Sequence, residues 1–248
     1  MSSKTANPVL HVFTARACFD PLAAAAELFE RQSGVHVEIG QCSRHCASMQ
    51  AEEAVGTVGG DDFLQEIADA GIYDCAIAGA EYLLDDGEVR GIIAKGRRRS
   101  IARRNAAILV QAGNPLGLSQ LHDLARPGLR IAVSVLDCLK GLWEDISSRA
   151  GLSEPIRKNI TFYANGCISI IEAVAQGKVD AAFGWSAFAH LSPKIAVLPL
   201  PPGQNVSRGT AIGMLATCKQ PELTCRFMDF LTTPAARSCY ARLGWEQA

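Results

Sequence analysis

The sequence predicts an α/β fold with two lobes, each built on a mostly parallel sheet flanked by helices. Short apolar strands alternate with helical patterns along the chain, which is typical of a parallel sheet covered on both faces. The 248 residues are 48% apolar, enough for one large core or two modest ones. Two connectors, near residues 97–104 and 199–204, interrupt the alternation and indicate two lobes.

The predicted strands are short apolar runs bounded by turn residues. They cover residues 9–13 (VLHVF), 35–39, 73–78, 106–111, 130–133, 161–163, 180–184 and 210–217. The first helix is predicted to run from Pro21, after the N-cap Asp20, to Gln32, and Gly34 ends it. The other predicted helices cover residues 43–55, 61–70, 119–125, 138–150, 168–176, 221–231 and 234–243.

The connectors divide the chain into a discontinuous first lobe, residues 1–100 with 204–248, and a continuous second lobe, residues 101–203. In such folds a ligand binds between the lobes, at the carboxyl ends of strands and the amino ends of helices. We therefore expect the binding cleft at this junction.

Charge and hydropathy exclude several function classes. The formal net charge is −1, which argues against nucleic-acid binding, and we interpret the basic run at residues 95–104 (KGRRRSIARR) as a solvated connector. No window approaches the roughly 18 apolar residues of a membrane span, and no apolar stretch of signal-peptide length follows the start. The sequence predicts a cytoplasmic protein without a membrane span, or a periplasmic one if a leader was removed.

Nine cysteines occur at no regular spacing. Irregular spacing in a chain this large is not typical of a disulfide framework, and an odd number cannot all pair within one molecule. We therefore expect mostly reduced thiols.

Four segments together resemble the molybdate-binding branch of the type II periplasmic binding proteins. These segments are VFTARACFDPLAAAAELFERQSGVHVEIG, NAAILVQAGNPLGLSQLHDLARPGLRIAV, VAQGKVDAAFGW and FMDFLTTPAARSCYARLGW. The four segments follow one another in the order and spacing of that family, and together they cover nearly the whole chain. The resemblance implies a two-lobed, non-enzymatic solute-binding protein, with the permease of an ABC transporter as its partner.

In that family, serine hydroxyls and backbone N–H groups at helix starts hold the oxyanion, together with a tyrosine. Carried over by position, the two serines fall on Ala17 and Cys42, the backbone contacts near Cys138 and Cys167, and the tyrosine on Trp185. Both hydroxyl donors are therefore missing. We expect molybdate to bind poorly, because each unpaired oxyanion acceptor in a closed cleft costs on the order of 1–3 kcal/mol.

Four cysteines, Cys18, Cys42, Cys138 and Cys167, lie where a strand leads into a helix, two in each lobe. Thiols at helix amino ends have lowered pKa values and bind soft metals as thiolates. We predict that these four face one cleft and hold an iron–sulfur cluster (4Fe-4S), whose negative charge the helix ends would stabilise. A thiophilic, arsenite-like oxyanion ranks second, and a single zinc or copper(I) ion third.

Other residues are candidates for the same site. Arg16 is expected to place a positive charge near the ligand, and Trp185 to form an aromatic wall. Cys46 and His45 are further candidate ligands, one helical turn beyond Cys42. The remaining cysteines, Cys75, Cys218, Cys225 and Cys239, are expected to be small buried hydrophobic residues.

The leading function is a non-enzymatic protein that closes two lobes on a thiophilic ligand. It would deliver this ligand to a transporter or to a protein that receives a metal cluster. The alternative within the same class is a molybdate, tungstate or arsenite-like oxyanion. The rival class is a cysteine-dependent enzyme with His45 as its base. No motif of a metalloprotease, serine hydrolase, P-loop or dinucleotide-binding enzyme occurs in the sequence.

Overall fold

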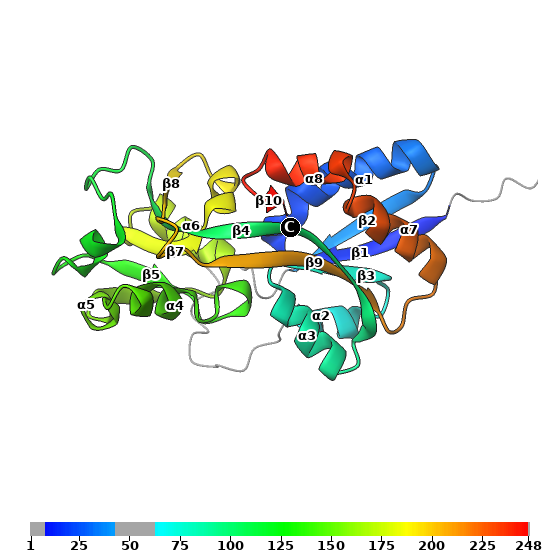
Figure 1. Ribbon diagram of the computed structural model, residues 1–248, viewed down its shortest axis with the longest axis horizontal. Helices are drawn as coiled ribbons and strands as arrows, with labels where there is room; N and C mark the ends of the chain where they lie inside the picture. Colours follow the sequence, from blue (N-terminus) through cyan, green and yellow to red (C-terminus); the bar gives the residue numbers. More distant parts are fainter. Residues whose placement is uncertain (1–7, 43–62, 248) are drawn as a thin grey trace, which may run out of the picture.

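The computed structural model describes residues 8–42 and 63–247 of the chain. Two lobes lie side by side, and two long strands, β4 (Ile93–Gln111) and β9 (Ser207–Leu215), run between them (Figure 1). The strands pair in the order β2-β1-β3-β9-β4-β7-β5-β6, and β8 and β10 also pair with β4. This arrangement confirms the predicted two-lobed α/β fold. The lobe boundaries given above stay a prediction.

The first lobe is built on three parallel strands. They are β1 (Val9–Thr14), β2 (His36–Gln41) and β3 (Cys75–Ala78), with β1 in the middle. Helices cover both faces of this sheet, each over its own apolar cluster (Figure 1). One face carries α1 (Phe19–Ser33), α7 (Pro221–Leu231) and α8 (Pro234–Ala241), and the other carries α2 (Phe63–Ala70) and α3 (Glu81–Val89).

The second lobe repeats the arrangement around β5 (Ile131–Val133). This strand pairs in parallel with β6 (Ile160–Tyr163) and β7 (Ala181–Trp185). Strands β7 and β8 (Ile195–Pro199) run antiparallel to β4. A third apolar cluster fills this lobe. Its helices and 3₁₀ turns are η3 (Leu121–Ala125), η4 (Asp137–Leu139), α4 (Leu142–Arg149), α5 (Ser153–Arg157), α6 (Cys167–Ala175) and η5 (Ser186–Leu191).

Helix ends follow local chemistry that is visible in the sequence. Gly34 closes α1 in the left-handed conformation (φ 70°), and its N–H donates to the Glu30 carbonyl. Helices α7 and α8 begin at Pro221 and Pro234, positions where a backbone N–H would have no acceptor within the helix. The Thr233 hydroxyl caps α8 by accepting from the Ala236 N–H. The predicted helix at 221–231 therefore has the bounds of α7.

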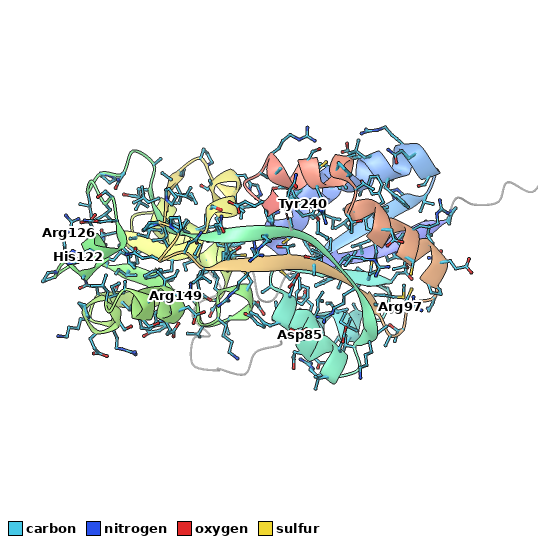
Figure 2. All side chains as sticks on the ribbon, in the orientation of Figure 1. Asp85, Arg97, His122, Arg126, Arg149 and Tyr240 are labelled. Carbon is cyan, nitrogen blue, oxygen red and sulfur yellow. The ribbon has the colours of Figure 1, made fainter. Side chains whose placement is uncertain are left out.

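The basic run, interpreted as a solvated connector, is part of the strand β4 that runs between the lobes, and most of its charged side chains are at least partly exposed. Arg98 to Asn105 pair with β9. Acidic neighbours balance part of the charge: Arg98 pairs with Glu88 (2.9 Å) and Arg99 with Asp229 (2.8 Å). Arg97 lies at the end of the molecule remote from the second lobe (Figure 2). The run is thus a strand that spreads its charges along its length.

Other predicted elements differ in smaller ways. The helix predicted at 138–150 divides into η4 and α4, because Gly141 between them adopts φ 71°. Helices α3 and α5 and strand β8 were not predicted, and the helix predicted at 43–55 lies outside the described residues. Within the two described ranges, no helix combines the length and apolarity needed to cross a membrane.

The core of the first lobe yields a stability prediction. Phe227 on α7 is fully buried, and its ring packs edge-on against Phe29 of α1 at 5.1 Å. We expect Phe227→Ala to lower the free energy of unfolding by about 3–5 kcal/mol, because the cavity left behind does not collapse completely. Urea denaturation measures this loss. Leu116→Ala, at a side chain 47% exposed, is the control, and an equal loss in both variants would contradict the packing argument.

Candidate functional site

A cavity lies where the turns after several strands meet the starts of helices. Its lining comes from the turn after β1 (Ala15, Ala17), the ends of β2 (Cys42) and β3 (Gly79), the η4 turn (Cys138) and the start of α6 (Cys167). Both lobes contribute, since β1 to β3 belong to the first and η4 and α6 to the second. The cavity therefore lies at the junction where the fold class predicts a ligand.

Three of the four predicted cysteines, Cys42, Cys138 and Cys167, line this cavity and are buried. Cys18 does not line it. The short turn η1 (Arg16–Cys18) places Cys18 in the core beneath α1, with no exposed surface. Cys18 is still near the other site residues, since Arg104, Cys138 and Cys167 all influence its pKa. The role of these cysteines in binding stays a prediction.

The prediction of lowered thiol pKa values was wrong for Cys18 and Cys138. Burial raises the pKa of Cys18 to about 12, and the nearby Arg104 guanidinium offsets only part of this effect. Burial also raises the pKa of Cys138, again against the influence of Arg104. At both thiols the free-energy cost of removing a thiolate from water exceeds its attraction to Arg104. Both thiols are therefore neutral near pH 7.

Arg16 and Trp185 lie near the site without lining the cavity. The Arg16 backbone N–H donates to Cys42 Sγ (3.2 Å), and its guanidinium lies 5.7 Å from the centre of the Phe19 ring. Trp185 is fully buried and packs against Arg104, so it supports a cavity residue instead of forming a wall. The candidates Cys46 and His45 lie outside the described residues.

Sequence reasoning missed Arg104, a cavity residue with no exposed surface. Its guanidinium stacks on Trp185 at 4.8 Å, and its Nη2 donates to the Gly79 carbonyl. Its Nε and Nη1 are buried and have no hydrogen-bond partner among the described residues. Strand parity gives no signal for Arg104, because residues of both parities in the apolar stretch that follows, Ala106 to Val110, are buried.

The charge of Arg104 has no carboxylate partner in the described part of the chain. Burial lowers the pKa of Arg104, but Cys138, Cys18 and Cys167 act in the opposite direction and the net shift is upward. Its strongest electrostatic neighbours are thus thiols, two of them neutral near pH 7. A buried cation without a compensating anion lowers the stability of the folded protein, and an anion in the cavity would compensate its charge.

Gly79 permits the close approach of Arg104 and Cys138. A Cβ atom at this position would lie 2.8 Å from Arg104 Nη2 and 3.2 Å from Cys138 Cβ. Both distances are below ordinary van der Waals contact, so a side chain here would displace one of the two residues. The absence of a side chain at Gly79 therefore sets the geometry of this corner of the cavity.

Two residues of the first lobe and its connecting strand hold the η4 turn in place. Arg208 on β9 donates from Nη1 to the carbonyls of Cys138 (3.0 Å) and Lys140 (2.8 Å). The Tyr82 hydroxyl on α3 donates to the carbonyl of Asp137, a residue with positive φ (44°). These bonds fix the backbone that carries Cys138 against the opposite lobe.

The described residues contain no cluster of side chains that forms a metal centre. Within residues 8–42 and 63–247, no three His, Cys, Asp or Glu side chains are arranged so that they can hold a metal ion. The cavity offers the centre of a water molecule about 20 Å³, close to the ~10–15 Å³ that a single water needs. The iron–sulfur, zinc and copper(I) predictions therefore have no support in the structure.

Comparison with known proteins assigns the family. The family model described as "Bacterial extracellular solute-binding protein" matches residues 10–246. The molybdate-binding protein ModA of Mycobacterium bovis is 24% identical over 165 residues, which are 65% of this chain and 61% of that protein. The match thus spans less than two thirds of this curated relative.

Two solved structures share the fold over nearly the whole chain. The periplasmic molybdate-binding protein of Azotobacter vinelandii has a TM-score of 0.75 at 19% identity, covering 96% of this chain and 99% of that one. The sulfate-binding protein SubI of Mycobacterium tuberculosis has a TM-score of 0.76 at 12% identity, covering 96% and 86%. All three relatives are named as binding proteins and none as an enzyme. The chain belongs to the bacterial extracellular solute-binding proteins.

Proposed function

We propose that this protein binds a small oxyanion in the cavity between its lobes and delivers it to the permease of an ABC transporter. The observation that carries the proposal is Arg104, a fully buried arginine with two unpartnered N–H groups at the cavity. An anion would restore the charge balance there and accept these donors in charge-assisted hydrogen bonds.

Helix α6 also favours an anionic ligand. It begins at Cys167, which lines the cavity, so its first N–H groups lie beside the ligand space. The amino end of a helix carries partial positive charge and unpaired donors, and it attracts anions. The guanidinium and the helix end therefore act in the same direction.

The relatives agree with an oxyanion but do not decide which one. Two are named for molybdate and one for sulfate. A shared fold alone does not fix a ligand, and the choice depends on the residues of the site. At both positions where the family resemblance places serine hydroxyls, Ala17 and Cys42, the side chains line this cavity. The site therefore offers weaker donors to a tetrahedral oxyanion than hydroxyl groups would.

A substitution of Arg104 tests the proposal. We expect Arg104→Met to weaken oxyanion binding by about 2 kcal/mol or more, roughly 30-fold, because the charged donors are lost. Thermal stability of the ligand-free protein should not fall, since an uncompensated buried charge is removed. Calorimetry with molybdate, tungstate, sulfate and arsenate measures the first effect, and thermal unfolding measures the second.

The matched control for this test is Arg103→Met. Arg103 is the neighbouring residue, but it is exposed and contacts Ser207. The Arg103→Met variant should bind oxyanions with the same affinity as the unchanged protein. Equal affinity in the Arg104 and Arg103 variants, or binding by the unchanged protein of neither arsenite nor any of these four oxyanions, would refute the proposed function.

The close approach at Gly79 gives a second test. Gly79→Ala should weaken binding of the same oxyanions about tenfold, or about 1.4 kcal/mol, because the added Cβ displaces Arg104 or Cys138. Gly203→Ala is the control, since a Cβ there meets no atom within 4 Å. Titration calorimetry compares the two. If both variants bind like the unchanged protein, the position of Arg104 does not depend on Gly79.

A further inference from the structure

The lining of the cavity is chemically unusual for a site that binds oxygen ligands. Cys42, Cys138 and Cys167 contribute three thiols, and most of the remaining side chains are apolar, among them Phe63 and Leu139. A thiol is a weak hydrogen-bond donor. Apart from Arg104 and the helix end, the wall therefore offers little to a hard tetrahedral oxyanion, but it offers sulfur to a ligand whose central atom bonds to sulfur.

Two of these thiols and Arg104 lie together in the second lobe and the strand beside it. Cys138 and Cys167 follow the neighbouring parallel strands β5 and β6 and both line the cavity, and Cys167 is close enough to raise the pKa of Cys138. Cys138 also lies beside the Arg104 guanidinium. Of the groups near this thiol, Arg104 lowers its pKa most and so opposes the effect of burial. The cavity thus holds two neighbouring thiols and an unpartnered N–H donor.

We infer that the ligand is a trivalent arsenic oxyacid, which bonds to the sulfurs of Cys138 and Cys167 and accepts a hydrogen bond from Arg104 through its remaining oxygen. This rests on the proposed function, because it uses the same cavity and the same arginine. It narrows the ligand from small oxyanions in general to one thiophilic class.

The bonding step balances without a further reactant. At each of two positions an As–O bond of arsenous acid and an S–H bond of a cysteine break. An As–S bond forms at each position, and the hydroxyl leaves with the thiol proton as water. The third hydroxyl, beside the Arg104 guanidinium, releases its proton to solvent, so the bound group carries one negative charge that compensates the buried arginine. Arsenic stays trivalent, so no oxidant or reductant is needed. Neutral thiols supply the protons that leave, which agrees with the raised pKa of Cys138.

Size favours this ligand over a tetrahedral oxyanion. After two water molecules have left, only arsenic and one oxygen remain to be accommodated beside the sulfurs. A tetrahedral oxyanion keeps all five of its heavy atoms. The space open to the centre of a water molecule is about 20 Å³, so the smaller bound group requires less separation of the lobes.

Arsenite and arsenate form a matched pair of probes, because only the trivalent form exchanges oxygen for sulfur directly. The protein is incubated with either one in the absence of oxygen and of added thiols, then desalted, and arsenic per chain is determined by mass spectrometry. We expect about one arsenic per chain from arsenite, with As–S bonds in the X-ray absorption spectrum, and no As–S bonds from arsenate.

Variants identify the sulfurs. Cys138→Ser and Cys167→Ser should each lose at least tenfold in arsenite retention, and Cys138→Ala checks that a buried hydroxyl is not the cause. Cys225→Ser, on α7 away from the cavity, should retain arsenite fully. Thermal unfolding of the ligand-free variants confirms that each is folded.

The outcomes separate this inference from the proposed function. If arsenate or another oxyanion binds in an Arg104-dependent manner but arsenite is not retained, the proposed function stands and the arsenic inference is wrong. Equal arsenite retention in the unchanged protein and in both cysteine variants also overturns it. If neither arsenite nor any oxyanion binds, the proposed function fails with it.

Discussion

The buried guanidinium of Arg104 is the interaction on which the rest of the site depends. Taking a charge out of water is costly unless a partner compensates it. Here Trp185 stacks on one face at 4.8 Å and the Gly79 carbonyl accepts one donor, while Nε and Nη1 have no partner among the described residues. This uncompensated charge lies at the junction of the lobes, where a bound anion would compensate it and accept hydrogen bonds from these two N–H groups.

The architecture holds Arg104 through the two strands that join the lobes. Arg104 pairs with Arg208 in the β4–β9 ladder, and two residues later Ala106 pairs with Trp185 of β7. Arg208 in turn fixes the turn that carries Cys138. Strand register thus places the arginine, its aromatic support and a cavity thiol together. Because β4 and β9 run through both lobes (Figure 1), a ligand at Arg104 contacts residues on either side of the junction.

Much of the fold was predictable, since local signals and the family resemblance agree. The alternation of strands and helices gave the two-lobed α/β class, and proline at a helix start gave the bounds of α7. The site was predictable only in part. Strand-to-helix turns brought Cys42, Cys138 and Cys167 to the cavity, but η1 directs Cys18 into the core. Arg104 was missed because a run of charges suggests exposure to solvent, whereas pairing with β9 and stacking on Trp185 of β7 bury this one arginine. Burial, which the sequence does not quantify, reversed the expected direction of the thiol pKa values.

The most direct test of the account is a crystal structure of the protein grown with arsenite in the absence of oxygen, with anomalous data collected at the arsenic absorption edge. The account predicts an arsenic peak in the cavity, with an oxygen about 2.7–2.9 Å from Nε or Nη1 of Arg104, the length of a charge-assisted hydrogen bond. An arsenic peak only on the outer surface, with both nitrogens of Arg104 still unpartnered, would contradict it.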